Sequence, residues 1–509
     1  MMNMKKRIAL GVASAIAMAA APAFAGTDIF FNPLTQSSAV ATPNHINELT
    51  QPWTAPAGVS QVQLTSMKEI EAAIGQSVVR VPGLGTGASM WDMVAFDPSG
   101  KFIFIPHETQ FGAGLSRYDI ENDTTTVLFR GDSNGATGNW SNDFGAFDPA
   151  VYTPNNTVIV AEEWAGQGRM IEVVNPFAAP ADIQIRELQS IANVAHEGIK
   201  FSADNKTMYY VDEYNSGSIY KFVMKKAGDY AGKGQTFVLK VDAFAGDVVG
   251  NYNAAANLNQ PRTGLATWVP LTDADGNKLT SVDPFDNATL GGRPAADEVG
   301  GTPYGRPEDL EISKLANRKP VLYFAATSEQ SVYSIEELGN GKAQVRLFAS
   351  ETATPKNLGM PATTGVVNSP DNLAQDALGN IYIIEDAPNG DVIGGDIWFA
   401  RDTDNDGVAE SLDHFLSIQV DGAEATGMIF NPAKPTQFVV SVQHPDSTGI
   451  ANSQGDALWL FDLKDVVAPI CEKSKRHTFF NPVRTCSHDY DFNFVKALER
   501  AGDKYGHKR

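Results

Sequence analysis

The chain is predicted to be an all-β protein, a six-bladed β-propeller for which seven blades remain an alternative. First, apolar strand segments recur six times, and each runs into acidic or amide residues. Second, the repeated units start mostly about 45 to 65 residues apart, with one gap near 110, which is the scale of four-stranded blades. Third, the 45 glycines and 28 prolines suit a turn-rich β architecture. An up-and-down sandwich would explain the strands but not the acids at matching strand ends.

The six strand ends share an apolar run that is followed at once by polar oxygen-bearing side chains. They are residues 102–105 before His107 and Glu108, 158–160 before Glu162 and Glu163, 208–211 before Asp212 and Glu213, 321–324 before Ser328 and Glu329, 381–384 before Glu385 and Asp386, and 438–442 before Gln443 and His444. A hairpin that repeats around one axis brings such residues together, so a central metal site is expected.

The first residues form an export signal, not part of the fold. Lys5, Lys6 and Arg7 precede a short apolar stretch, and cleavage is expected after Ala25 in the 1–25 segment. No later segment is long enough to span a membrane as a helix. The mature protein is therefore expected to be soluble and periplasmic or secreted.

The charge balance excludes some partners. The formal net charge is −21, and removal of the three basic residues of the signal would make it −24. Nucleic acid and anionic membranes require a basic surface, so neither is an expected partner. The acidity suits a protein that takes up cations, although acidity for solubility alone would look the same.

The domain organisation follows from the repeat. Residues 26–85 are a lead-in that contains a helix at 66–74, and residues 86–467 form the propeller. Residues 224–305 fill the wide gap and are expected to be a long insertion near one mouth. The six units are expected to start near Met93, Val151, Gly198, Asp309, Asn372 and Gly427.

The C-terminal extension, residues 468–509, follows the last blade and is expected to contain a helix at 494–501. The two cysteines of the chain, Cys471 and Cys486, both lie in it. In an oxidising compartment a disulfide between them is expected, and a metal role is the alternative.

One loop carries a calcium-binding pattern. Acidic residues occupy positions 1, 3, 5, 9 and 12 of the loop, with Gly407 at position 6. Calcium takes six to eight oxygen ligands, and the glycine allows the sharp turn that directs them inward. The predicted ligands are Asp402, Asp404, Asp406, Glu410 and Asp413. The loop is expected between two strands; a solvated acidic hairpin is the alternative.

The candidate chemistry lies in two further sets of residues. Carboxylates at strand ends suit Ca²⁺, Mg²⁺ or another oxygen-ligated metal, and their convergence requires cations for neutralisation. Arg306, at the start of a unit, can bind phosphate with two parallel hydrogen bonds beside such a cluster. The alternative for Arg306 is an internal ion pair with Glu308 or Asp309.

The ordered motifs of the chain resemble those of PhoX-type alkaline phosphatases over about residues 85 to 463. The motifs are His107-Glu108, Ala161-Glu162-Glu163, His196-Glu197-Gly198, Arg306-Pro307-Glu308, Ser369-Pro370-Asp371-Asn372, Glu385-Asp386, Thr426-Gly427 and Gln443-His444-Pro445. The resemblance implies a six-bladed propeller that hydrolyses phosphate esters at a central site with calcium and an oxo-bridged iron pair.

The resemblance also implies roles for individual residues. Glu162 and Glu197 would bind metals, Glu308 would be a calcium ligand in the catalytic set, and Arg306 and Asn372 would contact substrate oxygens. The whole expected set of central metal ligands is Glu108, Glu162, Glu163, Glu197, Glu308, Glu385 and Asp386.

Two departures from the family pattern favour calcium over iron. The family carries a cysteine iron ligand where this chain has Ala161, and the signal has no twin arginine. Several Ca²⁺ ions are therefore the expected cofactors, with Fe³⁺ as an open alternative.

The predicted function is that of an exported, calcium-dependent phosphoesterase acting on a small phosphate ester. Two alternatives remain open at this point. A lactonase-type propeller hydrolase would need a single divalent ion and no Arg306, and a calcium-stabilised binding module would show no turnover. The oligomeric state is not predicted.

Overall fold

The computed structural model describes residues 29–40, 47–75, 89–386, 393–445 and 454–466. The predicted signal 1–25 and the whole predicted C-terminal extension 468–509, with its helix at 494–501 and the Cys471–Cys486 disulfide, lie outside the described residues. No helix in the described part of the chain is long and apolar enough to cross a membrane.

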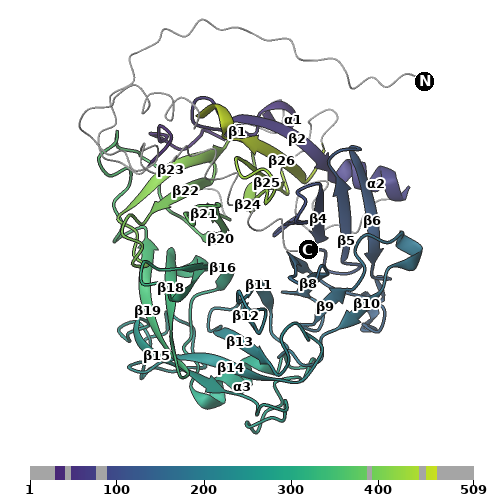
Figure 1. The fold of residues 1–509 in the computed structure, drawn as a ribbon, viewed down its shortest axis with the longest axis vertical. Helices are drawn as coiled ribbons and strands as arrows, with labels where there is room; N and C mark the ends of the chain where they lie inside the picture. The colour runs from purple at the N-terminus through teal and green to yellow at the C-terminus, as the bar shows by residue number, and fades with distance from the viewer. Residues whose placement is uncertain (1–28, 41–46, 76–88, 387–392, 446–453, 467–509) are drawn as a thin grey trace, which may run out of the picture.

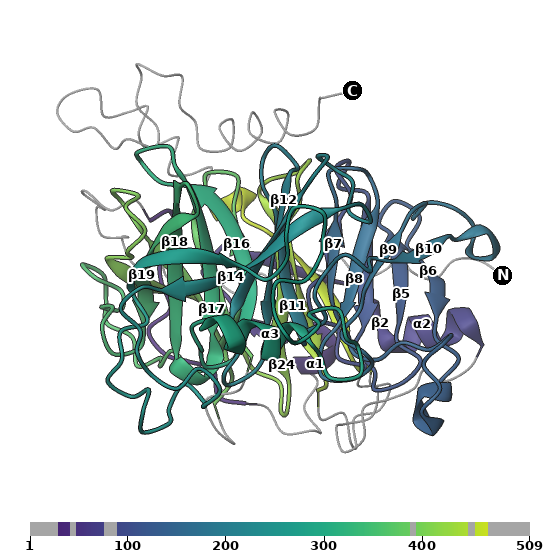
Figure 2. The same cartoon turned by 90° about the horizontal axis from the view of Figure 1, so that it is seen from below.

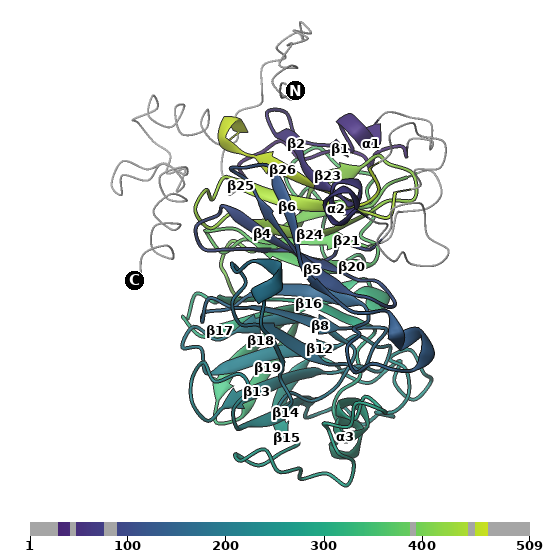
Figure 3. The same cartoon turned by 90° about the vertical axis from the view of Figure 1, so that its right-hand side faces the viewer.

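The described chain is an all-β, propeller-like ring of antiparallel sheets (Figure 1). Strands β11, β16 and β20 lie nearest the centre in this view, and β15, β19 and β23 lie at the periphery. Figure 2 and Figure 3 show the ring edge-on from two perpendicular directions.

The first two sheets are four-stranded and follow the chain order. The first comprises β3 (Ala95–Phe96), β4 (Phe102–His107), β5 (Gly114–Asp119) and β6 (Thr124–Arg130). The second comprises β7 (Phe147–Tyr152), β8 (Val158–Glu162), β9 (Met170–Val173) and β10 (Ile185–Glu187). Two 3₁₀ turns, η1 (Asn134–Thr137) and η2 (Pro180–Asp182), lie in their connections.

The third sheet has nine strands and joins two four-stranded units. One unit is β11 (His196–Phe201), β12 (Thr207–Asp212), β13 (Ile219–Met224) and β14 (Gly234–Val241). The other is β16 (Pro307–Lys314), β17 (Pro320–Ala326), β18 (Ser331–Gly339) and β19 (Lys342–Ser350), with the 3₁₀ turn η3 (Thr327–Glu329) after β17. Strand β15 (Gly264–Pro270) pairs with both β14 and β19.

This junction bears on two expectations. The predicted six blades are not six separate sheets, because β15 hydrogen-bonds two units into one sheet. The predicted insertion 224–305 is also only partly an insertion, since it supplies β14, β15 and helix α3 (Gly292–Val299).

The N-terminal lead-in completes the last two sheets. One sheet comprises β20 (Pro370–Gln375), β21 (Ile381–Glu385), β22 (Asp396–Arg401) and β23 (Ser411–Ile418), with β1 (Trp53–Thr54) at its edge. The other comprises β24 (Glu424–Phe430), β25 (Gln437–Gln443) and β26 (Ala457–Asp462), and β2 (Ser60–Ser66) is its outer strand. Because β2 and β26 come from opposite ends of the propeller region, their pairing closes the ring.

Two short helices precede the ring, α1 (Asn47–Thr50) and α2 (Met67–Ile74). Helix α2 confirms the helix predicted at 66–74. Ser66 is its N-cap residue, in extended conformation, and Gly75 ends it in the left-handed conformation. Met67 and Ile70 bury one face of α2 against Ile103 and Leu458 of the ring.

Six clusters of buried hydrophobic side chains lie between neighbouring units of the described ring. Strand β12 shows how one strand serves two clusters. Met208 and Tyr210 belong to the cluster shared with β8, whereas Tyr209 and Val211 belong to the cluster shared with β16. Successive side chains of a strand point to opposite faces, so a strand buried on both faces reads as an unbroken apolar run.

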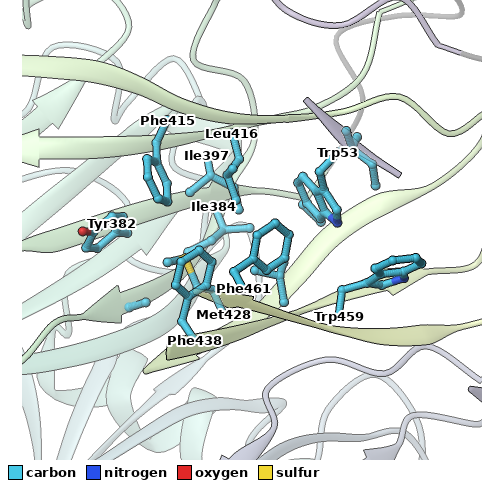
Figure 4. Packing of buried hydrophobic residues seen from close by; sticks show 14 of the residues in the cluster. Trp53, Tyr382, Ile384, Ile397, Phe415, Leu416, Met428, Phe438, Trp459 and Phe461 are labelled. Carbon is cyan, nitrogen blue, oxygen red and sulfur yellow. The ribbon is translucent and has the colours of Figure 1, made fainter. Parts of the chain in front are cut away.

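Figure 4 shows the cluster between the last two sheets, where Trp53 from the lead-in lies among ring residues such as Phe415 and Phe461. Trp53 is fully buried. Burying a side chain of this size stabilises the fold by roughly 2 to 3 kcal/mol. The lead-in is therefore held to the ring by packing as well as by strand pairing.

Candidate metal centre and active site

A β-bulge recurs in the first strand of five units and directs one residue from each toward the centre. The strand register is interrupted between Phe147/Ala150, His196/Ile199, Pro307/Leu310, Pro370/Leu373 and Thr426/Ile429. The first residue inside each interruption is Asp148, Glu197, Glu308, Asp371 and Gly427 in turn. Bulges change the direction of side chains and are common beside active sites. Four carboxylates are thus placed by one repeated backbone device.

A second set of carboxylates follows the second strand of each unit. The backbone N–H groups of Glu108, Glu163, Glu213 and Asp386 donate to the carbonyl groups of Ser89, Ala146, Ala195 and Ser369, at 2.9, 2.9, 2.8 and 3.0 Å. The same bond in four units puts these acids in equivalent positions beside the first strand. In these four units the pattern of strand-end acids therefore has a structural basis.

Two groups of three buried carboxylates have the geometry to share a cation. Asp92, Glu108 and Asp148 form the first triad, and Glu197, Glu308 and Asp371 form the second triad. Within each triad, one oxygen per residue lies within 4.8 Å of the others. Oxygen donors at this spacing suit a hard cation such as Ca²⁺.

Burial and mutual repulsion disfavour the charged form of these groups. Burial, as the largest cause, raises the pKa of Glu308 to about 7 and that of Asp92 to about 6. The same two causes, burial first and neighbouring carboxylates second, hold the pKa values of six other acids well above their usual range. They are Glu108, Asp148, Glu163, Glu197, Asp371 and Asp386.

Some carboxylate oxygens of the two triads lack a hydrogen-bond donor within the described chain and are suited to bind a cation. Three buried carboxylate oxygens accept no hydrogen bond from the described residues: both oxygens of Glu197 and Oδ2 of Asp148. An unpaired buried carboxylate is costly, and a metal ion removes that cost. These oxygens, one in the first triad and two in the second, therefore indicate two cation positions.

Arg306 lies against the second triad. Its Nε contacts Glu213 and lies 3.2 Å from Glu308 Oε1. Burial would lower the pKa of Arg306, but Glu308 and Glu213 outweigh burial and raise it well above the usual value. The internal ion pair considered from the sequence is thus present, yet the side chain is still 35% exposed and reaches solvent.

Residues of the 224–305 region hold the backbone around Arg306, which has a φ of 54°. The Gly305 N–H donates to Glu329 Oε1 at 2.7 Å, and Arg262 donates to Glu329 Oε2 at 2.7 Å. The Tyr252 hydroxyl donates to the Ser328 carbonyl at 2.7 Å. The left-handed conformation is strained for a residue with a side chain, so these contacts are needed to maintain it.

Asn372, predicted to contact substrate, is fully engaged within the protein. Its Nδ2 donates to Asp92 Oδ1 at 2.9 Å, and its Oδ1 accepts from the Thr426 hydroxyl and the Gly427 N–H. It is buried. Its visible role is to fix Asp92 of the first triad against strand β24.

Three predicted metal ligands lie away from the triads, each with its own partner. Glu162 accepts from Arg169 Nε at 2.9 Å, Glu385 accepts from Trp398 Nε1 at 2.7 Å, and Asp413 accepts from Arg401 Nε at 2.9 Å. Because N–H donors already satisfy these buried carboxylates, their contacts support a structural role. Asp386 and Glu163, the neighbours of two of them, face the centre instead.

The loop with the calcium pattern connects β22 and β23, as expected. Asp402, Asp404 and Glu410 approach one another closely enough to share an ion. Asp402 also accepts from the Asp406 and Gly407 N–H groups at 3.1 and 3.0 Å. Asp406 and Asp413 are not part of this group among the described residues.

Asp92 and Asp148 were missed in the sequence, and Glu213 and Asp371 were named there as a strand-end acid and as part of a motif without an assigned role. A signal was available, because Phe147-Asp148 precedes an apolar strand in the same way as His196-Glu197 and Pro370-Asp371. Aligning first strands, in addition to second strands, would have found Asp148.

A cavity of about 420 Å³ lies further along the first strands, at the opposite end of the axis from the acids. Its lining residues follow the bulges in sequence, as Ile199 follows Glu197 and Leu373 follows Asp371. The lining is largely apolar. The acids therefore face one mouth of the ring, and this cavity belongs to the other.

A protein-family model described as alkaline phosphatase PhoX matches residues 129–446. The chain belongs to the PhoX alkaline phosphatase family. Membership makes it a phosphoric ester hydrolase and confirms the resemblance inferred from the motifs. A comparison with curated protein sequences gives no match.

One solved structure supports the fold of this PhoX family member, and a second is less similar. Pseudomonas fluorescens PhoX in complex with vanadate, a transition state analogue, is similar with a TM-score of 0.57 and 14% identity, over 86% of this chain and 99% of that chain. A Xanthomonas campestris gluconolactonase has a TM-score of 0.40 and 10% identity, over 86% of this chain and 98% of that chain.

Ala161, where the resemblance led us to expect a cysteine, is fully buried in the cluster that contains Ile159 and Met170. Its methyl group offers no donor atom to a metal. The candidate ligand groups found in the described residues are composed of carboxylates alone.

Proposed function

We propose that this PhoX family member is an exported, calcium-dependent phosphoesterase that hydrolyses small phosphate esters at the two central triads. The observation that carries the proposal is the pair of buried carboxylate triads with orphan oxygens beside a part-exposed arginine. Export is inferred from residues 1–25. Six blades are inferred from the six hydrophobic clusters between four-stranded units.

Calcium is the favoured cofactor because the donors are hard oxygens. Glu197, Glu308 and Asp371 would hold one ion, and Asp92, Glu108 and Asp148 another. Bound cations at these positions would neutralise phosphoryl oxygens and stabilise charge that develops in the transition state. Iron is not part of the proposal, because the cysteine ligand is replaced by Ala161.

Arg306 would bind the phosphoryl group from the solvent side. Glu213 and Glu308 orient its guanidinium, and the exposed part of the fork can donate to phosphate oxygens. Fixed donors of this kind lower the barrier because they need no reorganisation as charge develops. Hydrolysis breaks the P–O ester bond; the hydroxyl of water goes to phosphorus and its proton to the leaving alcohol.

The loop with Asp402, Asp404 and Glu410 would hold a further calcium ion with a structural role. It connects two strands at a distance in sequence from the triads, and its acids are partly solvated. Its predicted effect is on stability and not on turnover.

The test is metal analysis of protein purified from the periplasm, together with p-nitrophenyl phosphate turnover with and without calcium. Calcium at two or more equivalents and a loss of at least about 100-fold in kcat/KM for Arg306→Ala are expected. Arg306→Lys should recover only part, since lysine lacks the planar fork. Arg346→Ala, which removes a peripheral ion pair with Glu336, is the matched control.

Calcium binding without turnover of any ester would contradict the proposal and favour the calcium-stabilised binding module. Turnover that survives in Arg306→Ala would show that phosphate binding does not depend on Arg306. Turnover of lactones in place of esters would favour the lactonase-type alternative.

A further inference from the structure

Two large aromatic side chains remain exposed at equivalent positions of neighbouring units. Trp164 follows Glu163 and is 41% exposed, and Tyr214 follows Glu213 and is 49% exposed. The equivalence comes from the backbone, because Glu163 and Glu213 make the same N–H to carbonyl bond in their units. Both rings are therefore at the mouth where the acids lie.

The Trp164 ring is anchored to the first triad. Its indole Nε1 donates to Glu108 Oε1, and Glu108 is one of the three acids that share the first candidate cation position. An indole has a single N–H donor, so this bond sets the edge of the ring that faces the acids. The remainder of the ring contributes to the exposed surface.

The Tyr214 ring is anchored beside Arg306. It packs over the guanidinium of Arg293, 3.9 Å from the ring centroid, and Arg293 is in turn fixed by Asp212 through two hydrogen bonds of 2.6 Å. The Tyr214 carbonyl accepts from the Arg306 N–H at 3.2 Å. The backbone of Tyr214 is thus hydrogen-bonded to the backbone of the residue proposed to bind phosphate.

We propose that Trp164 and Tyr214 form a subsite for a planar ring on the alcohol side of the phosphate ester, as in a nucleoside monophosphate. The inference rests on the proposed function, since it places the ester phosphate at the triads and Arg306. Aromatic side chains bind planar rings by stacking, with little dependence on ring identity. Holding both rings through ionic partners lowers the conformational entropy that stacking would otherwise cost.

The test compares two substrates with similar leaving alcohols, adenosine 5′-monophosphate and glycerol 3-phosphate. In Trp164→Ala and Tyr214→Ala, the ratio of kcat/KM for the nucleotide over the glycerol ester is expected to fall about 10-fold, mainly through KM. Trp164→Phe retains a ring but not the N–H, so it should keep the ratio even where both rates decline. Phe177→Ala is the matched control, because Phe177 is 45% exposed and packs on Phe102 instead.

An equal loss on both substrates would overturn the subsite and assign the two aromatics a purely structural role. An unchanged ratio would overturn it as well. If the wild-type protein turns over neither ester, the proposed function fails, and calorimetric binding of the nucleotide in calcium then tests the subsite. Binding that is weakened in Trp164→Ala would support the subsite; binding equal to that of glycerol 3-phosphate would refute it.

Discussion

The central triads and the Asp402–Glu410 loop are both acidic, but different surroundings act on their carboxylates. The triads combine residues from several units around the ring, all of them buried, and include oxygens without a hydrogen-bond donor. The loop is one connection between β22 and β23, where Asp402 accepts from the N–H groups of Asp406 and Gly407. Burial makes cations a requirement at the centre, whereas the loop can satisfy part of its charge by itself.

The comparison also shows that a strong sequence motif and a strong physical demand are different things. The loop carries the more specific motif, yet its acids keep contact with water. The centre has only a scattered repeat of acids, yet its structure leaves buried charge uncompensated. Four experiments test this difference between the two acidic regions.

The largest effect is expected from Glu197→Gln. Glu197 accepts no hydrogen bond from the described residues, so the isosteric change removes a charge without breaking a donor contact. Turnover should fall by more than about 100-fold with one calcium equivalent fewer, because a proposed ligand is lost. In calcium-free protein the same variant should melt at a higher temperature than wild type. Glu187→Gln on exposed β10 is the control, and undiminished turnover in Glu197→Gln would refute a role in metal binding.

The next effect concerns pH in the calcium-free protein. The folded-state pKa values of Glu308, about 7, and Asp92, about 6, exceed the unfolded values of 4.5 and 3.8. Between these values the folded protein binds more protons, so the free energy of unfolding falls as pH rises from about 4 to about 7. Urea unfolding in the presence of a chelator at pH 5 and pH 8 measures this change in the free energy of unfolding. Calcium should weaken this pH dependence, because a bound cation favours the charged form of the carboxylates. Stability that rises with pH in the chelator would contradict the prediction.

A smaller effect is expected from Arg262→Ala. The change removes the ion pair of Glu329, which keeps the Tyr333 hydroxyl as a donor, and loosens the contact between Glu329 and the Gly305 N–H that precedes Arg306. We expect kcat/KM to decrease about 10-fold, with weaker inhibition by inorganic phosphate and partial rescue by Arg262→Lys. Thermal melting of the same variant distinguishes a local effect on Arg306 from global destabilisation. If the Arg346→Ala control lost as much stability and as much phosphate affinity as Arg262→Ala, the effect could not be attributed to the position of Arg306.

The smallest effect is expected in the loop. The double variant Asp402→Asn and Asp404→Asn should keep turnover within about two-fold of wild type, since no triad residue is altered. The rise in Tm on addition of calcium should shrink by about 1–2 °C, the size expected when roughly 1 to 2 kcal/mol is removed from a chain of this length. A loss of turnover comparable to that of Glu197→Gln would show that the two acidic regions are coupled.

Much of the fold was accessible from local sequence. Apolar runs such as residues 208–211 predicted strands buried on both faces, and Ser66 predicted the start of α2. The joining of two units through β15 was not accessible, because residues 264–270 have no distinctive pattern and pair with strands on either side of them in sequence. The ring closure by β2 depends on a partner about 400 residues away.

Strand periodicity, turn residues and ordered motifs are local features, so they were enough to predict the all-β architecture, the PhoX family and the residue types available to a metal site. Which of the acids act together depends on how the chain folds in space. Glu162 and Glu163 are adjacent in the chain, yet Arg169 neutralises the first, while the second faces Glu213 and Glu108 at the centre. A carboxylate's function depends on what surrounds it in space, and neighbours in sequence point to opposite faces of a strand.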